Sequence, residues 1–196
     1  MFELPTTITV NGKEYPIRNK GDYRMVFDCF SALTDDELDI SYRAITALII
    51  FIDGFETIED VMSEFPTQEI FNEAVHQMYL WFNCGQEEVG GVHTSKGVVD
   101  WEQDQQLIAG AINAVSHIEI RSLLYLHWWT FLGYYFNIGE GAFSTIVSIR
   151  SKISKGKKLE KHEQDFKRSN PQYFVSRQKK TAEELSFEDE LRKLWQ

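Results

Sequence analysis

The residues best suited to acid–base chemistry in this sequence stand beside a tryptophan. Glu102 and Asp104 follow Trp101 closely, and two carboxylates can act as general acid and base when their surroundings separate their pKa values. Residues two positions apart on a helix point in different directions, however. The pattern therefore favours acids of a first helical turn, which stabilise the positive helix end, over a catalytic pair.

His127 is the second candidate for chemistry, because it directly precedes Trp128 and Trp129. A histidine can act as a base or a metal ligand, but no second His or Cys stands near this one at metal-ligand spacing. We predict a core histidine that makes one hydrogen bond. We also predict that the two thiols, Cys29 and Cys84, are small core residues of a reduced protein.

Glycine-rich segments could bind phosphate, but only between a strand and a helix. Gly90-Gly91 falls within residues 86–97, which have the composition of an exposed loop, and residues 139–141 are typical of a turn between helices. We therefore predict no catalytic residue, no cofactor and no metal site, and we interpret the protein as non-enzymatic.

Charge is divided unevenly along the 196 residues, whose formal net charge is −10. Residues 1–145 carry 7 basic and 22 acidic side chains, whereas residues 146–196 carry 13 basic and 8 acidic ones. Most of the basic side chains lie between Arg150 and Lys180, which favours a solvated linker or a face for an acidic protein segment. Nucleic acid is a less favoured partner, because the acidic part would repel a polyanion.

The last residues form a short amphipathic pattern. Ser186 and Asp189 resemble a capping box, and one apolar stripe follows, made of Phe187, Leu191, Leu194 and Trp195. So short a helix is marginal in isolation, so it must dock either on its own body or in the groove of a partner. We take these four residues, with Trp128 and Trp129, as candidate partner-binding residues, and we expect the two tryptophans to be either core or groove-lining.

The elements that must position these residues are mainly helical. Asn11-Gly12 between two β-type segments, 7–10 and 13–17, predicts a hairpin. Apolar residues at helical spacing predict helices over 22–33, 41–53, 66–82, the residues after a cap at Asp100, 122–139 and 142–149. Residues 122–139 contain no formal charge, and we interpret them as the central helix of a bundle rather than as a membrane span.

The expected architecture is a mainly α protein: a bundle of five or six helices with a small N-terminal β-hairpin. Residues 1–150 form the helical body, residues 151–180 a basic connector and residues 181–196 the C-terminal amphipathic helix. The composition, 43% hydrophobic and 14% aromatic, is that of a soluble globular chain. The first residues lack the basic and apolar regions of a signal peptide, so we expect a cytosolic protein.

Several segments resemble a known family in their order and spacing. They are Asp22-Tyr23-Arg24, Asp100 to Asp104 with Leu107-Ile108, Leu126-His127-Trp128-Trp129 with Phe131, and Ile146 to Arg150. Together with the N-terminal hairpin, they resemble the bacteriophage Gp15 proteins of tailed phages and prophages of Gram-positive bacteria. The likeness runs from about Leu4 to Phe174, and the sequence Leu-His-Trp-Trp is its most specific element.

Members of that family are similar in role to tail-assembly chaperones. The resemblance implies a protein of the bacterial host cytoplasm that coats the tape-measure protein while tail-tube subunits assemble, and that is absent from the mature virion. Possible partners are the tape-measure protein, the tail-tube protein and further copies of this chain, the last through the C-terminal helix. The alternatives are a minor structural or connector protein of the virion and, less favoured, a nucleic-acid-binding adaptor.

Overall fold

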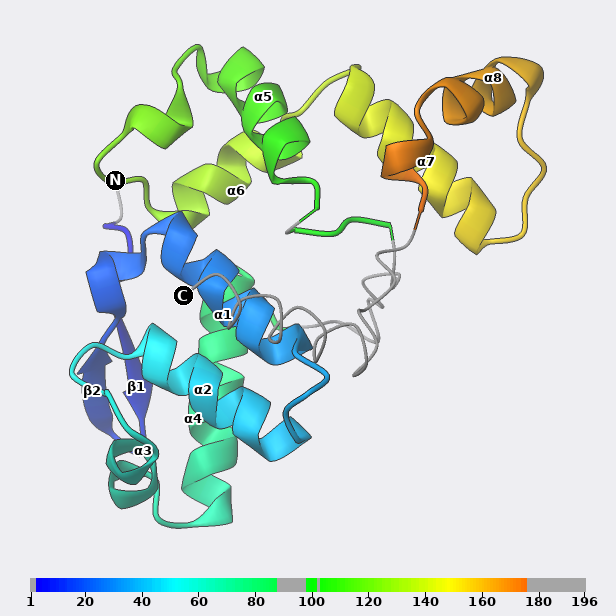
Figure 1. The fold of residues 1–196 in the computed structure, drawn as a ribbon. Coiled ribbons are helices and arrows are strands. Elements are labelled where there is room, and N and C mark those ends of the chain that lie inside the picture. Colours follow the sequence, from blue (N-terminus) through cyan, green and yellow to red (C-terminus); the bar gives the residue numbers. More distant parts are fainter. Residues whose placement is uncertain (1–2, 88–97, 102, 176–196) are drawn as a thin grey trace, which may run out of the picture. The chain divides into compact units, whose positions relative to one another are not determined.

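A computed structural model describes residues 3–87, 98–101 and 103–175. These residues contain one β-hairpin and eight α-helices (Figure 1). The chain divides into two compact units, unit 1 over residues 1–145 and unit 2 over residues 146–196. The mainly α class and the N-terminal hairpin are confirmed, but the described residues contain more helices than the five or six predicted.

The hairpin consists of β1 (Thr7–Val10) and β2 (Lys13–Pro16), which pair antiparallel. Asn11 and Gly12 adopt φ of 48° and 75°, the two positive values that a type I′ turn requires. The ring of Tyr15 lies edge-on to Phe55 and Phe65 of unit 1. A two-stranded ribbon is marginal alone, so these contacts give the hairpin the support it needs.

Four helices follow the hairpin. They are α1 (Tyr23–Thr34), α2 (Ile40–Phe51), α3 (Ile58–Glu64) and α4 (Gln68–Phe82). Helices α1 and α2 lie side by side, and α4 contacts both α2 and β1 (Figure 1). A 3-10 turn at Arg18–Gly21 leads into α1, and the Arg18 guanidinium donates to the carbonyls of Ile49, Ile50, Ile52 and Phe55. Arg18 thereby caps the C-terminus of α2.

Helix α3 is absent from the helices that the sequence pattern predicts. It is only seven residues long, and Val61 is its one buried residue, so it has no detectable apolar period. A capping box starts it: the Thr57 hydroxyl accepts from the Asp60 amide, and the Asp60 carboxylate accepts from the Thr57 amide. Local capping therefore defines this helix more than hydrophobic periodicity does.

Helix α5 (Gln105–Ser116) begins later than the cap predicted at Asp100. Asp100 instead caps a turn, since its Oδ1 accepts from the Gln103 amide at 2.9 Å. Asp104 is fully buried directly before the helix, and its Oδ2 accepts from the Asp100 amide at 3.0 Å. Asp104 is thus part of a structural turn. The side chain of Glu102 lies outside the described residues.

The prediction of one long central helix over residues 122–139 is wrong. A 3-10 turn at Ile120–Ser122 is followed by a non-helical segment, and α6 spans only Trp128–Phe136. Phe136 is 75% exposed, so the helix is not buried on every face. Among the described residues, no helix is long and apolar enough to cross a membrane.

The described part of unit 2 contains residues 146–154 of α7 (Ala142–Ser154), α8 (Lys161–Ser169) and a 3-10 turn at Pro171–Tyr173. Lys152 Nζ forms an ion pair with Glu163 Oε1 at 2.6 Å, and Arg150 Nε donates to the Tyr173 carbonyl at 2.8 Å. Hydrogen bonding from Lys152 holds the pKa of Glu163 below its usual value. Residues 151–175, predicted as part of a connector, therefore contain ordered helical structure.

Candidate partner-binding surface

Two of the family-like segments, Asp22-Tyr23-Arg24 and Leu126 to Trp129, meet at the N-terminus of α1. Asp22 caps this helix, because its Oδ1 accepts from the Arg24 amide at 3.0 Å. Its Oδ2 accepts from the Leu126 amide at 3.0 Å, although the two residues are 104 positions apart. The Asp22 side chain is 7% exposed, so both hydrogen bonds are protected from water. A single carboxylate thus joins the start of α1 to the segment before α6.

Arg24 holds the same segment from the other side. Its guanidinium pairs with Asp22 at 3.2 Å and donates to the carbonyls of Leu123 and Leu124. The Tyr23 amide donates to the Leu126 carbonyl at 3.0 Å, and the Tyr125 hydroxyl donates to the Lys20 carbonyl at 3.0 Å. The backbone of residues 123–126 is therefore fixed at several points.

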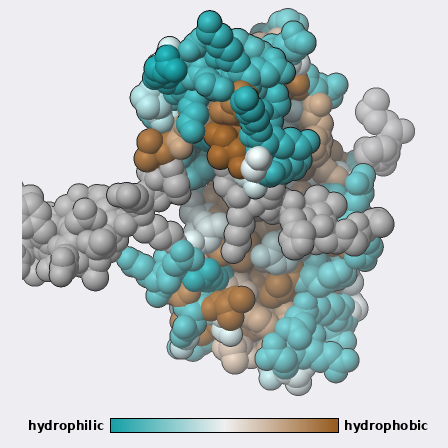
Figure 2. All heavy atoms as spheres, turned by 90° about the vertical axis from the view of Figure 1, so that its right-hand side faces the viewer, coloured by the Kyte–Doolittle hydropathy of each residue, from teal (hydrophilic) through white to brown (hydrophobic). Residues whose placement is uncertain are grey.

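This fixed backbone presents apolar side chains to solvent. Leu124 is 100% exposed, and Tyr125 is 46% exposed. The face of the molecule drawn in Figure 2 is mostly hydrophilic, with hydrophobic residues gathered in several places. When a partner covers a side chain on an ordered backbone, little further backbone entropy is lost. Leu124 is therefore well suited to contact another protein.

A groove of about 300 Å³ adjoins this segment between α1 and α5. The apolar residues around it are Tyr23, Phe27, Ile108, Ala109, Ile120 and Phe131, which are buried except for the half-buried Phe27. Arg24, Asp28 and Arg121 contribute charges of both signs to it. Since Arg24 also binds the Leu123 and Leu124 carbonyls, the groove and the exposed Leu124 belong to one surface. We call this the Leu124 surface.

Glu119 fixes the far edge of the groove. It pairs with Arg121 at 2.7 Å, and its other carboxylate oxygen accepts from Asn113 Nδ2 at 2.8 Å. Hydrogen bonds from Arg121 lower the pKa of Glu119 to about 2. Asn113 in turn accepts from the Ile120 amide at 2.9 Å. Burial raises the pKa of Asp28 on the opposite helix.

His127 lies behind the Leu124 surface, and its two ring nitrogens have different partners. Nδ1 accepts from the Trp129 amide at 3.1 Å and so caps α6, while Nε2 lies 3.1 Å from the Pro5 carbonyl. Nε2 must therefore carry the proton. Burial lowers the pKa of His127. The predicted core histidine is confirmed, with two hydrogen bonds instead of one.

The two candidate tryptophans differ in exposure, but the indole of each donates to a backbone carbonyl near the end of α4. Trp128 is 2% exposed and donates to the Phe82 carbonyl at 2.9 Å. Trp129 is half-buried and donates to the Trp81 carbonyl at 2.8 Å. Trp128 also stacks on Phe131 and lies edge-on to Trp101, with centroids 6.0 Å apart. The structure thus places Trp128 in the core. The other four candidates, Phe187, Leu191, Leu194 and Trp195, lie outside the described residues.

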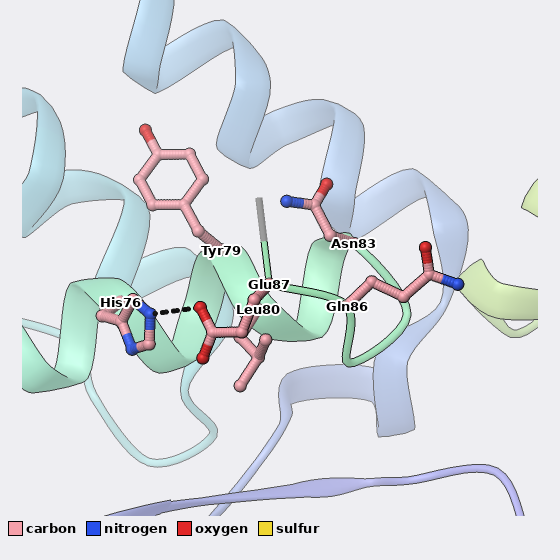
Figure 3. Close-up of a pocket in the computed structure, with 6 residues that line it drawn as sticks. All are labelled: His76, Tyr79, Leu80, Asn83, Gln86 and Glu87. Carbon is pink, nitrogen blue, oxygen red and sulfur yellow. Dashed lines mark hydrogen bonds and ion pairs between the residues drawn. The ribbon is translucent and has the colours of Figure 1, made fainter. Parts of the chain in front are cut away.

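A second hollow lies along α4 and the residues that follow it (Figure 3). His76 points toward Glu87, and Nε2 of the histidine lies 3.3 Å from Oε2 of the carboxylate. Tyr79, Leu80, Asn83 and Gln86 complete the lining. Such a hollow can offer hydrogen bonds to a ligand. Within the described ranges, no group of three or more His, Cys, Asp or Glu residues is arranged to hold a metal ion.

The two cysteines occupy different environments. Cys29 is fully buried in α1, and burial raises the pKa of its thiol. Cys84 is only half-buried, and it follows α4 with a φ of 56°. The prediction of two core thiols therefore holds for Cys29 and is wrong for Cys84. A thiol whose pKa is raised carries little thiolate at neutral pH, and it reacts slowly for that reason.

The surface described above belongs to a helical phage protein. Residues 1–174 match the family model described as Bacteriophage Gp15 protein, and the chain belongs to that family. The match includes every segment that carried the resemblance in the sequence. No curated protein and no solved structure matches the chain.

Sequence reasoning missed the parts of the surface that depend on long-range contacts. It noted Asp22 and Arg24 as the start of a helix and as part of the family resemblance, and it placed Leu124 inside the supposed central helix. The one available local signal was an Asp directly before a helical pattern, which indicates an N-cap. No local pattern indicates that the same Asp also binds the Leu126 amide.

Proposed function

We propose that this protein is a non-enzymatic tail-assembly chaperone that binds the tape-measure protein in the cytoplasm of the bacterial host. Membership of a bacteriophage family supports a role in phage biology. The observation that carries the proposed binding activity is the Leu124 surface. It combines an exposed leucine on a fixed backbone with an adjoining apolar groove.

The chemistry of the surface fits an amphipathic helical client. An exposed apolar stripe on a long client promotes aggregation, and covering it with a complementary apolar surface prevents this. The groove would take one or two side chains of the client helix. Leu124 would contact the next turn of that helix. Arg24, Asp28 and Arg121 would meet charged residues that flank the client's stripe.

The charge of unit 1 would keep the complex soluble. Residues 1–145 carry a formal charge of −15. Clients coated with several copies would therefore repel one another, and this repulsion would oppose aggregation. A chaperone of this kind would leave when tail-tube subunits enclose the tape-measure protein. We therefore propose that it is absent from purified virions, where a minor connector protein would be found.

Co-expression with the tape-measure protein of the same phage tests the proposal. The wild-type chain should copurify with the client and keep it soluble, and Leu124→Ser should reduce the recovered complex at least about tenfold, which corresponds to about 1.4 kcal/mol. Ile40→Ser is the matched control, because Ile40 is 82% exposed but lies at the start of α2. It should leave recovery unchanged.

Two outcomes would count against the proposal. A tape-measure protein that is equally soluble and unbound in the presence of the wild-type chain would remove the chaperone role. Equal losses from Leu124→Ser and Ile40→Ser would show that binding does not depend on the Leu124 surface.

A further inference from the structure

Unit 2 carries a compact basic surface around one exposed apolar side chain. Ile153 is 41% exposed near the end of α7, and Lys155, Lys157 and Lys158 follow it, all exposed. Gly156 has a φ of 63°, and its amide donates to the Ile153 carbonyl at 2.9 Å, so this turn has a defined conformation. We call these residues the lysine turn.

The charges of the lysine turn have no partner in the part of the chain that the structure describes. The ion pairs of unit 2 there involve Lys152 with Glu163, His162 with Glu160, and Arg168 with Asp165. None of them includes the three lysines of the turn. The turn therefore offers several cationic groups and an apolar centre to an acidic partner.

Helix α3 of unit 1 has the opposite character. Ile58 and Met62 lie one helical turn apart and are 42% and 51% exposed, and the exposed carboxylates of Glu56 and Glu59 stand beside them in the sequence. Neither carboxylate belongs to an ion pair among the described residues. We call these four residues the α3 face.

The wider sequence around the α3 face is also free of competing cations. Residues 44–87 contain eight acidic residues and no Lys or Arg. Lys13 of β2 reaches this region, but it already pairs with Glu64. An external basic group is therefore the most favourable partner for the α3 face.

We propose that the lysine turn of one copy docks on the α3 face of a second copy. Each patch has an apolar centre and a charged rim, and the two rims have opposite signs. The contact joins two different patches, so it is heterologous, and a pair of copies retains one free α3 face and one free lysine turn. Copies can then add in a row, an arrangement that suits a protein covering an elongated client.

The charge distribution favours this partner over nucleic acid. A polyanion that binds the lysine turn is repelled by the net negative charge of the whole chain, −10, whereas a second copy supplies an acidic surface as the binding site itself. Because the proposal concerns the protein alone, it can be tested without any client. Its outcome is therefore independent of the proposed chaperone activity.

Sedimentation velocity of the nuclease-treated full chain is the test, over about 1–200 μM in low salt. The wild type should form larger species as concentration rises, and raising the salt from about 50 mM to about 500 mM should weaken association at least about tenfold, because screening shortens the range of surface charges. Glu56→Lys with Glu59→Lys should abolish association, and so should Lys157→Glu with Lys158→Glu.

Two further samples distinguish a specific contact from general charge effects. Combining all four substitutions, or mixing the two double variants, restores opposite charges across the contact and should restore association. Glu37→Lys with Asp39→Lys is the matched control, since it changes net charge equally on an exposed loop before α2, and it should associate like the wild type.

The proposal is overturned by a nuclease-treated wild type that stays monomeric at every concentration. Double variants that still associate would also overturn it, as would a four-substitution variant that is folded by circular dichroism but remains monomeric.

Discussion

Replacing Gly21 with Ala tests the packing behind the Leu124 surface. Gly21 has a φ of 79°, and an added Cβ would lie 2.5 and 2.7 Å from two ring carbons of Trp81 and 3.2 Å from His127 Nε2. The Trp81 ring cannot move freely, because it is 3% exposed and its Nε1 donates to the Pro5 carbonyl at 3.0 Å. The alanine must therefore displace a buried indole that is hydrogen-bonded.

The cost has two parts. A left-handed conformation costs a non-glycine residue about 1–2 kcal/mol. Forcing extra volume into a packed core costs about 1–3 kcal/mol more. We therefore expect Gly21→Ala to lower the free energy of unfolding by about 2–5 kcal/mol, measured by urea denaturation with tryptophan fluorescence.

Gly12→Ala is the matched control for this prediction. Gly12 has a φ of 75°, but an added Cβ would meet nothing within 4 Å. Its substitution should cost only the conformational part, about 1–2 kcal/mol. Equal losses for the two variants would refute the packing around Trp81 and His127 described above.

Three further predictions concern the same region. Asp22→Ala removes the cap of α1 and leaves the buried Leu126 amide without its acceptor, so the free energy of unfolding should fall by about 2–4 kcal/mol. Hydrogen exchange at the Leu126 amide should be faster, and unchanged exchange there would contradict the hydrogen bond from Leu126 to Asp22. Trp128→Phe leaves the Phe82 carbonyl without its indole donor, so the free energy of unfolding measured in urea should fall by about 1–3 kcal/mol. A loss below about 0.5 kcal/mol would argue against that hydrogen bond. The pKa of His127 is lowered in the folded state from its ordinary value of 6.5, so the unfolded chain binds the proton more readily. The stability that His127 contributes is therefore present above pH 6.5 and is lost as the pH falls through the folded pKa. His127→Asn keeps a capping oxygen and should reduce the dependence of the unfolding free energy on pH between about pH 5 and 7. An unchanged dependence would contradict the lowered pKa of His127 in the folded state.

Local patterns were sufficient to predict the elements that depend on local chemistry. Asn11-Gly12 supports the two positive φ angles of the hairpin turn, and that dipeptide alone predicts the turn. Helices α1, α2 and α4 each bury one face, and the observed bounds lie within about two residues of the predicted ones.

Residues 122–139 could not be predicted correctly, because their uniform apolar character has no period. The start of α6 depends on the His127 cap, and the extended segment before it depends on hydrogen bonds to Asp22 and Arg24 about 100 residues earlier. Hydrogen bonds between residues so far apart in the sequence leave no pattern in the neighbouring residues. For the same reason the exposure of Leu124 was not predictable from sequence.

The candidate site illustrates a similar limit. The rarity of Leu-His-Trp-Trp identified the segment that connects α1, α4 and α6, but composition does not separate a core tryptophan from a binding one. The structure buries Trp128, and the exposed group lies four positions earlier, at Leu124.

Photo-crosslinking from position 124 tests the central claim most directly. A photoreactive phenylalanine analogue replaces Leu124 in one variant and Ile40 in another, and each is co-expressed with the tape-measure protein. A chaperone that uses the Leu124 surface should give a crosslink to the tape-measure protein from position 124 and none from position 40. The account is contradicted if position 124 gives no crosslink while the wild-type chain still copurifies with that client.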